Sequence, residues 1–158
     1  MKITSESPSD LQINALLEHY QNRRYGDAER LAVSITQEFP KHQFAWKVLG
    51  AVLGQMGRMS EAAEANQTAV GLFPRDAEAH NNLGITLQQL GRLDEAEASY
   101  KQSIALKPDF VEAHDNLGNT LRELGRSAEA EASYKQVIAL KPDFVEAHNN
   151  LGLTLQEL

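Results

Sequence analysis

Apolar residues recur every three or four positions through most of the chain, which is the spacing of one face of an α-helix. In residues 77–110 this stripe first runs through Ala79, Leu83 and Leu87. A second amphipathic segment follows over roughly residues 94–106. The pattern therefore predicts two consecutive helices in this stretch.

Glycine and proline separate the predicted helices. Gly91 follows the first helix and tolerates the left-handed backbone conformation that commonly ends a helix. Pro108 follows the second helix, because proline lacks a backbone donor and disfavours helix in the residue before it. The same two residue types recur at Gly57, Pro74, Gly125 and Pro142, and Pro40 closes the first unit.

The helix pair repeats with a period of 34 residues. Residues 77–110 and 111–144 are identical at 26 of 34 positions without a gap. The predicted organisation is a lead-in at 1–8, a diverged unit at 9–42, further units at 43–76, 77–110 and 111–144, and a lone first helix at 145–158. A helix pair this short cannot bury both of its faces alone, so the units are expected to stack on one another.

Eight recurring positions resemble the signature of the tetratricopeptide repeat family, which has a large residue, Leu, Gly and Tyr in the first helix and Ala, Phe, Ala and Pro in the second. The matching residues are Trp46, Leu49, Gly50, Leu53, Ala62, Asn66, Ala69 and Pro74 in the second unit, His80, Leu83, Gly84, Leu87, Ala96, Tyr100, Ser103 and Pro108 in the third, and His114, Leu117, Gly118, Leu121, Ala130, Tyr134, Val137 and Pro142 in the fourth. The first unit departs most, because Gln12, Ala15 and Leu16 stand where the others have a large residue, leucine and glycine. The resemblance implies an all-α fold, a right-handed α-solenoid of antiparallel helix pairs.

The small residues of the signature have a packing explanation. Gly84 and Ala96 are expected where the two helices of a pair approach most closely. A leucine at the equivalent Gly118 or Ala130 should overpack that contact and cost about 1–3 kcal/mol. These positions are therefore predicted to be structural.

The resemblance also implies that the first helices line a concave groove, through residues two, five, six, nine, twelve and thirteen of each unit. Position six carries a row of asparagines, Asn82, Asn116 and Asn150. Because an amide both donates and accepts, such a row can hold the peptide groups of an extended chain. The repeat domains of the O-linked N-acetylglucosamine transferases look similar here. Alternatively, near-identical units copy the residue without using it, as the neighbouring Asn81 and Asn149 suggest.

Acidic residues dominate the rest of the predicted groove. The further candidate binding residues are Glu78, Asp115, Asn119 and Arg122, with Glu112, Glu123 and Glu146 adding negative charge. This set favours a polar or mildly basic extended peptide, although the three glutamates at position two also complement the positive ends of helix dipoles. The family's carboxylate clamp is disfavoured, because Asn116 and Asn119 lack the basic partners that it needs.

Composition narrows the choice of partner. The net charge of −7 disfavours binding to nucleic acid or to anionic membranes. No apolar run approaches the roughly 20 residues that cross a bilayer, and the first residues lack a signal-peptide pattern, so a cytoplasmic setting is expected. The chain has no cysteine, which rules out disulfides and thiolate metal sites.

No catalytic constellation is recognisable. His80, His114 and His148 occupy one position in successive units, so they should lie about 10 Å apart, too far to share a metal ion. They are expected to pack where Trp46 packs. The glutamates of the second helices are interpreted as a solvated face, and glycine-rich phosphate loops and nucleophile–base pairs are absent. The sequence predicts a protein without cofactor or metal that is not an enzyme.

Three functions remain open. The leading prediction is a module that binds a protein or peptide in the groove. The second is a self-assembling scaffold, in which the 145–158 helix forms a homodimer or end-to-end stacks because Leu151, Leu155 and Leu158 repeat the apolar seam of the interior units. The third treats the chain as the N-terminal, substrate-recruiting arm of a larger enzyme of glycosyltransferase or sulfotransferase type, by analogy alone.

Overall fold

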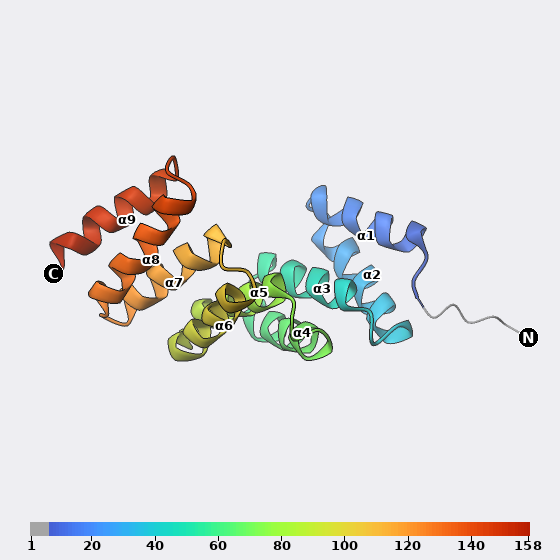
Figure 1. The fold of residues 1–158 in the computed structure, drawn as a ribbon. Helices are drawn as coiled ribbons and strands as arrows, with labels where there is room; N and C mark the ends of the chain where they lie inside the picture. Colours follow the sequence, from blue (N-terminus) through green and yellow to red (C-terminus); the bar gives the residue numbers. More distant parts are fainter. Residues whose placement is uncertain (1–6) are drawn as a thin grey trace, which may run out of the picture. The chain divides into compact units, whose positions relative to one another are not determined.

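A computed structural model describes residues 7–158, and this part of the chain contains nine α-helices and no β-strand. The all-α prediction is confirmed. The helices fall into two compact units, Met1–Pro74 and Arg75–Leu158. Unit 1 contains α1 (Asp10–Gln21), α2 (Tyr25–Glu38), α3 (Gln43–Gln55) and α4 (Met59–Leu72), and unit 2 contains α5 (Ala77–Gln89), α6 (Leu93–Leu106), α7 (Val111–Glu123), α8 (Ser127–Leu140) and α9 (Val145–Gln156) (Figure 1).

Within each unit, consecutive helices pack against each other. The first helices of neighbouring pairs also approach one another, α1 with α3 in unit 1, and α5 with α7 and α7 with α9 in unit 2. The second helices α2 and α4 make no such approach, nor do α6 and α8. The first helices therefore lie closer together than the second helices, which is the arrangement that curves a stack of helix pairs toward its first helices.

Glycines end the first helices as predicted. Gly57, Gly91 and Gly125 have positive φ angles of 77°, 73° and 73°. After Gly91 the backbone turns so that the N–H of Arg92 donates to the carbonyl of Leu87 at 2.9 Å, which satisfies an end carbonyl of α5. In the first repeat (residues 9–42) the matching residue is not glycine, and it adopts the same left-handed conformation at a higher steric cost. That residue is Arg23, with φ at 56°.

The predicted close approach inside each pair is confirmed at the signature glycines. A Cβ on Gly84 would lie 2.6 Å from Cε1 of Tyr100, and a Cβ on Gly118 would lie 2.7 Å from Cε1 of Tyr134. Both tyrosines are fully buried. The glycine in α5 or α7 thus makes room for the aromatic ring of α6 or α8.

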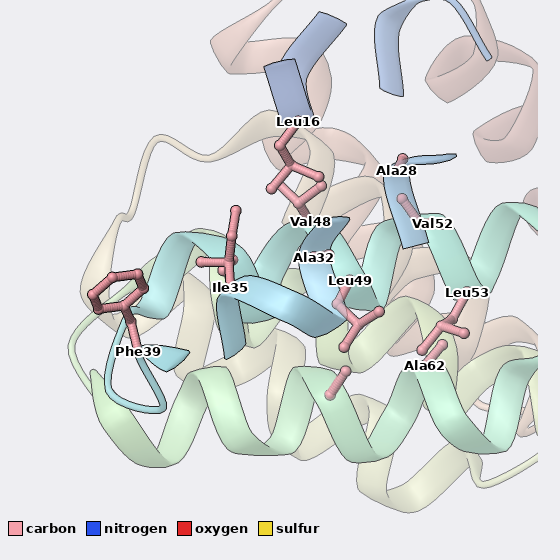
Figure 2. Packing of buried hydrophobic residues seen from close by; sticks show 12 residues of the cluster. Leu16, Ala28, Ala32, Ile35, Phe39, Val48, Leu49, Val52, Leu53 and Ala62 are labelled. Carbon is pink, nitrogen blue, oxygen red and sulfur yellow. The ribbon is translucent and has the colours of Figure 1, made fainter. Parts of the chain in front are cut away.

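In the diverged first repeat (residues 9–42) a large residue replaces the glycine and a small residue replaces the tyrosine. Leu16 stands at the glycine position and Ala32 at the tyrosine position, and both are fully buried in the core of unit 1. The same cluster includes Ile35 and Val52, and Figure 2 shows its side chains gathered between the helices. A large residue on α1 is therefore accommodated by a small one on α2, which keeps the packed volume close to that of the other pairs.

Candidate functional site

The predicted asparagine row lies on α5, α7 and α9, and two of its members, Asn116 and Asn150, each bond to a residue of the preceding first helix. Nδ2 of Asn116 donates to Oδ1 of Asn81 at 3.1 Å. Nδ2 of Asn150 donates to Oδ1 of Asn119 at 3.2 Å. Asn82 lies half-buried on α5. We call the surface formed by Asn82, Asp115, Asn116, Asn119, Arg122 and Asn150 the first-helix face.

Asn119 is the centre of a small polar network on this face. Its Nδ2 donates to Oδ2 of Asp115 at 3.3 Å. Its Oδ1 accepts from the hydroxyl of Tyr134 at 2.7 Å, as well as from Asn150. Burial raises the pKa of Tyr134 to about 12, so its hydroxyl remains a donor at neutral pH. The network fixes the orientation of the Asn119 amide.

Asp115 is a partly desolvated carboxylate. Burial raises its pKa above the usual value, the hydrogen bond from Asn119 opposes that rise, and the negative charge of Glu146 adds to it. Its Oδ1 atom is buried and has no hydrogen-bond partner among the described residues. Nη1 of Arg122 is also buried without a hydrogen-bond partner among the described residues. Two unsatisfied polar atoms of opposite character therefore lie on α7, and each costs free energy until a donor or acceptor reaches it.

A second polar row crosses the same seam nearer the ends of the helices. Nε2 of Gln88 donates to Oε1 of Glu123 at 2.6 Å. Nε of Arg122 lies 4.0 Å from Oε1 of Glu157. Sequence reasoning did not select Gln88 or Glu157. Their repeat positions offered a signal, because Gln88 matches Arg122 and Glu157 matches Glu123.

The position-two glutamates lie where a helix dipole is best complemented. Glu78, Glu112 and Glu146 occupy the first turns of α5, α7 and α9. A negative charge in the first turn favours the helix regardless of any ligand. These three residues consequently have a structural explanation, and their contribution to binding stays a prediction.

The recurrent histidines have a structural role in unit 2. Nε2 of His114 lies 2.8 Å from the carbonyl oxygen of Pro108, and Nε2 of His148 lies 2.8 Å from that of Pro142. In unit 1 the indole nitrogen of Trp46 donates to the Pro40 carbonyl at 2.9 Å. Histidine therefore takes the place of tryptophan, as expected. The described residues include no group of three or more acidic, histidine or cysteine side chains placed to hold a metal ion.

The second helices carry ion pairs, and one prediction about them is wrong. Glu97 was expected on a solvated face, but it is only 8% exposed. Nη1 of Arg126 lies 2.6 Å from its Oε2, and Nζ of Lys101 lies 2.6 Å from its Oε1. Arg126 also pairs with Glu129 at 2.7 Å. The hydrogen bonds from Lys101 and then from Arg126 lower the pKa of Glu97, and the Arg126 bond also joins α6 to the start of α8.

Sequence models of one family match nearly the whole described chain. Models described as tetratricopeptide repeat match residues 14–76, 77–110 and 99–132, and one described as TPR repeat matches residues 118–158. The chain belongs to the tetratricopeptide repeat family. No curated protein sequence gave a match. Among residues 7–158, no helix of this tetratricopeptide repeat protein has the length and apolarity needed to cross a membrane.

Solved structures agree with this assignment. MamA superposes with a TM-score of 0.86 at 22% identity, over 93% of this chain and 80% of MamA. PilF of Pseudomonas aeruginosa gives 0.85 at 20% identity, over 94% and 68% of the two chains. The first TPR of Spaghetti (RPAP3), bound to the HSP90 peptide SRMEEVD, gives 0.71 at 23% identity, over 72% and 90%. These likenesses show a shared tetratricopeptide repeat fold.

Proposed function

We propose that this protein binds an extended segment of another polypeptide on the first-helix face of α5, α7 and α9. The observation that carries the proposal is the row of amides that crosses successive first helices. The peptide bound to the Spaghetti (RPAP3) repeat supports a binding role for this fold. The role assigned to the face is binding, not catalysis.

The Asn116 amide keeps hydrogen-bonding capacity for a ligand. Asn116 uses one of its two N–H groups on Asn81, and its Oδ1 accepts no bond from any described side chain. One donor and one acceptor on this amide therefore remain for a peptide group. Such bonds contribute only about 0.5–1.5 kcal/mol each, so several repeats must act together.

The spacing of the row suits a polyproline II conformation of the ligand. Packed helices lie about 8–10 Å apart. A polyproline II chain has about three residues per turn and rises about 3.1 Å per residue, so the same side of the chain returns about every 9 Å. Successive asparagines could therefore bind every third peptide group of one extended segment.

Charge indicates the composition of the ligand. The first-helix face and its rim carry Asp115, Glu123 and the position-two glutamates, and Arg122 is partly neutralised by Glu157. A ligand with lysine or arginine beside its bonding peptide groups gains from this field, whereas a terminal carboxylate is repelled. We therefore expect a basic, internal segment of the partner.

The proposal is tested with a peptide selected by display from a random library. The affinity of the selected peptide is measured for the wild type and for a combined variant, Asn82→Ala with Asn116→Ala and Asn150→Ala. A loss of at least about tenfold is expected if each amide contributes within the range given above. The matched control deletes two exposed amides of the second helices, Gln102→Ala with Gln136→Ala, and should change the affinity less than twofold. Equal losses in both variants contradict the proposal.

Self-association through α9 is a second candidate, supported by a specific exposure pattern. Leu155 is 52% exposed, although the equivalent Leu87 and Leu121 are 4% and 2% exposed beneath α6 and α8. Leu158, three residues further on, is 65% exposed, and Leu153 is 50% exposed on a different side of the helix. Exposed leucines of this kind favour association. A protein that sediments as a monomer up to millimolar concentration in analytical ultracentrifugation would contradict this candidate. If a dimer is seen, Leu155→Lys should abolish it.

A further inference from the structure

Unit 1 contains an open groove on a surface distinct from the first-helix face. The groove has a volume of about 330 Å³ and is lined by residues of α2, α3 and α4. Its floor includes the half-buried side chains of Val33 and Trp46 and the buried Leu49. Glu29 and Glu64 lie at its edge. The groove thus combines an apolar floor with an acidic rim.

The equivalent positions in unit 2 carry different side chains at two decisive places. Lys101 stands 68 residues after Val33, and its Nζ lies 2.6 Å from Oε1 of Glu97. His114 stands at the position of Trp46 and is held by the Pro108 carbonyl. Unit 1 therefore has an aliphatic and an aromatic residue where unit 2 has a lysine and an imidazole. In unit 2 the lysine pairs with a glutamate. Val33, at the same repeat position in unit 1, offers no positive charge to the equivalent glutamate.

The rim of the unit 1 groove carries net negative charge. Arg58 pairs with Glu29 and, at 2.5 Å, with Glu61. Glu64 is exposed and forms no ion pair with any described residue. Three carboxylates and one guanidinium leave two negative charges around the apolar floor. A ligand with a cation beside an apolar group would therefore meet negative charge at the rim and apolar side chains at the floor.

We propose that this groove binds a partner polypeptide through one large apolar side chain, Leu, Met or Phe, flanked by lysine or arginine. The apolar side chain packs on the ring of Trp46 and against Val33. The neighbouring cation lies beside Glu64. This site is independent of the first-helix face, since all of its lining residues belong to unit 1.

The test uses a fluorescein-labelled peptide, Gly-Lys-Phe-Lys-Gly, and the full chain. Binding is followed by anisotropy and by the emission of Trp46, which is the chain's single tryptophan. Val33→Lys introduces the residue that Lys101 supplies in unit 2. The matched control is Gln67→Lys, an exposed residue at the same repeat position that does not line the groove. Trp46→His introduces the histidine that three other repeats carry at this position, and it provides a second variant that the fold accepts.

Saturable binding with a change in Trp46 emission is expected for the wild type. Val33→Lys, Trp46→His and replacement of the peptide's Phe by Ala should each weaken binding at least about tenfold, because they remove the apolar contact. Gln67→Lys and the combined asparagine variant should change it less than twofold. Absence of saturable binding at millimolar peptide, or equal affinities for Val33→Lys and Gln67→Lys, overturns the proposal. An emission change with protein concentration alone assigns the groove to a second copy of the chain and also overturns it.

Discussion

Replacing Gly118 by alanine isolates the packing contact between α7 and α8. The added Cβ would lie 2.7 Å from Cε1 and 3.0 Å from Cζ of Tyr134, a ring that is fully buried and bonded through its hydroxyl to Asn119. Overpacking of this kind costs about 1–3 kcal/mol. Alanine in a helix interior also gains about 1 kcal/mol over glycine. The net change alone is therefore ambiguous, and a reference variant is needed.

Gly152 supplies that reference because it occupies the same repeat position in α9. Apart from its chain neighbours and the nearby backbone of its own helix, no atom lies within 4 Å of the place its Cβ would take. Gly152→Ala should therefore stabilise the protein by about 0.5–1 kcal/mol through helix propensity alone. The difference in unfolding free energy between the two variants should be about 1–3 kcal/mol, measured by urea denaturation with far-UV circular dichroism. Equal stability of the two variants would refute the packing argument.

A compensating pair tests the same contact with the opposite sign. Gly118→Leu should be strongly destabilising, and adding Tyr134→Ala should recover part of the loss, because the Leu16 and Ala32 pair shows that this exchange of sizes is accepted. We expect a favourable coupling energy of about 1–3 kcal/mol in the double-mutant cycle. Strictly additive losses would show that the two positions do not share a volume.

Three further changes have defined outcomes. Arg23→Gly relieves a left-handed backbone and should raise the unfolding free energy by about 1 kcal/mol in urea denaturation; a decrease would contradict the φ assignment. Asp115→Asn introduces the residue that the preceding repeat carries at the same position, Asn81. It should stabilise the protein at pH 7 by less than about 1 kcal/mol, because the folded-state pKa of the half-exposed Asp115 is raised. That gain should shrink as the pH falls through the raised pKa, and thermal melts from pH 7 to pH 4 that show a constant gap would refute it. Glu97→Gln should cost about 1–3 kcal/mol at pH 7 and less below pH 4, whereas the exposed Glu129→Gln should cost less than Glu97→Gln does; similar losses in the two melts would contradict the bridging role.

The period of the sequence predicted the helix pairs, because glycine and proline stops and the apolar spacing act locally along each helix. It also predicted the place of His114, since one repeat position keeps one environment. It did not reveal that Leu16 and Ala32 exchange sizes, because each residue was compared with its own repeat position and not with its packing partner. Cross-pair contacts were missed for the same reason, and the burial of Glu97 depends on a residue of the next repeat.

The candidate site shows where a repeat sequence holds more information than its period. The bonds from Asn116 to Asn81 and from Gln88 to Glu123 both join residues 35 apart, one more than the repeat length. The Arg122 and Glu157 pair has the same separation. These three contacts therefore have an offset of one, whereas the bond from Asn150 to Asn119 joins residues 31 apart. Inspection at an offset of one would have identified the three contacts before the structure.

The most direct test of peptide binding on the first-helix face is the NMR response of the side-chain amides. A display-selected peptide is titrated into the isotope-labelled protein, and the NH₂ resonances of asparagine and glutamine are followed. We expect the resonances of Asn82, Asn116 and Asn150 to shift in proportion to occupancy while those of Gln102 and Gln136 stay unchanged. Shifts confined to the second helices, with the three asparagines unaffected at saturation, would contradict it.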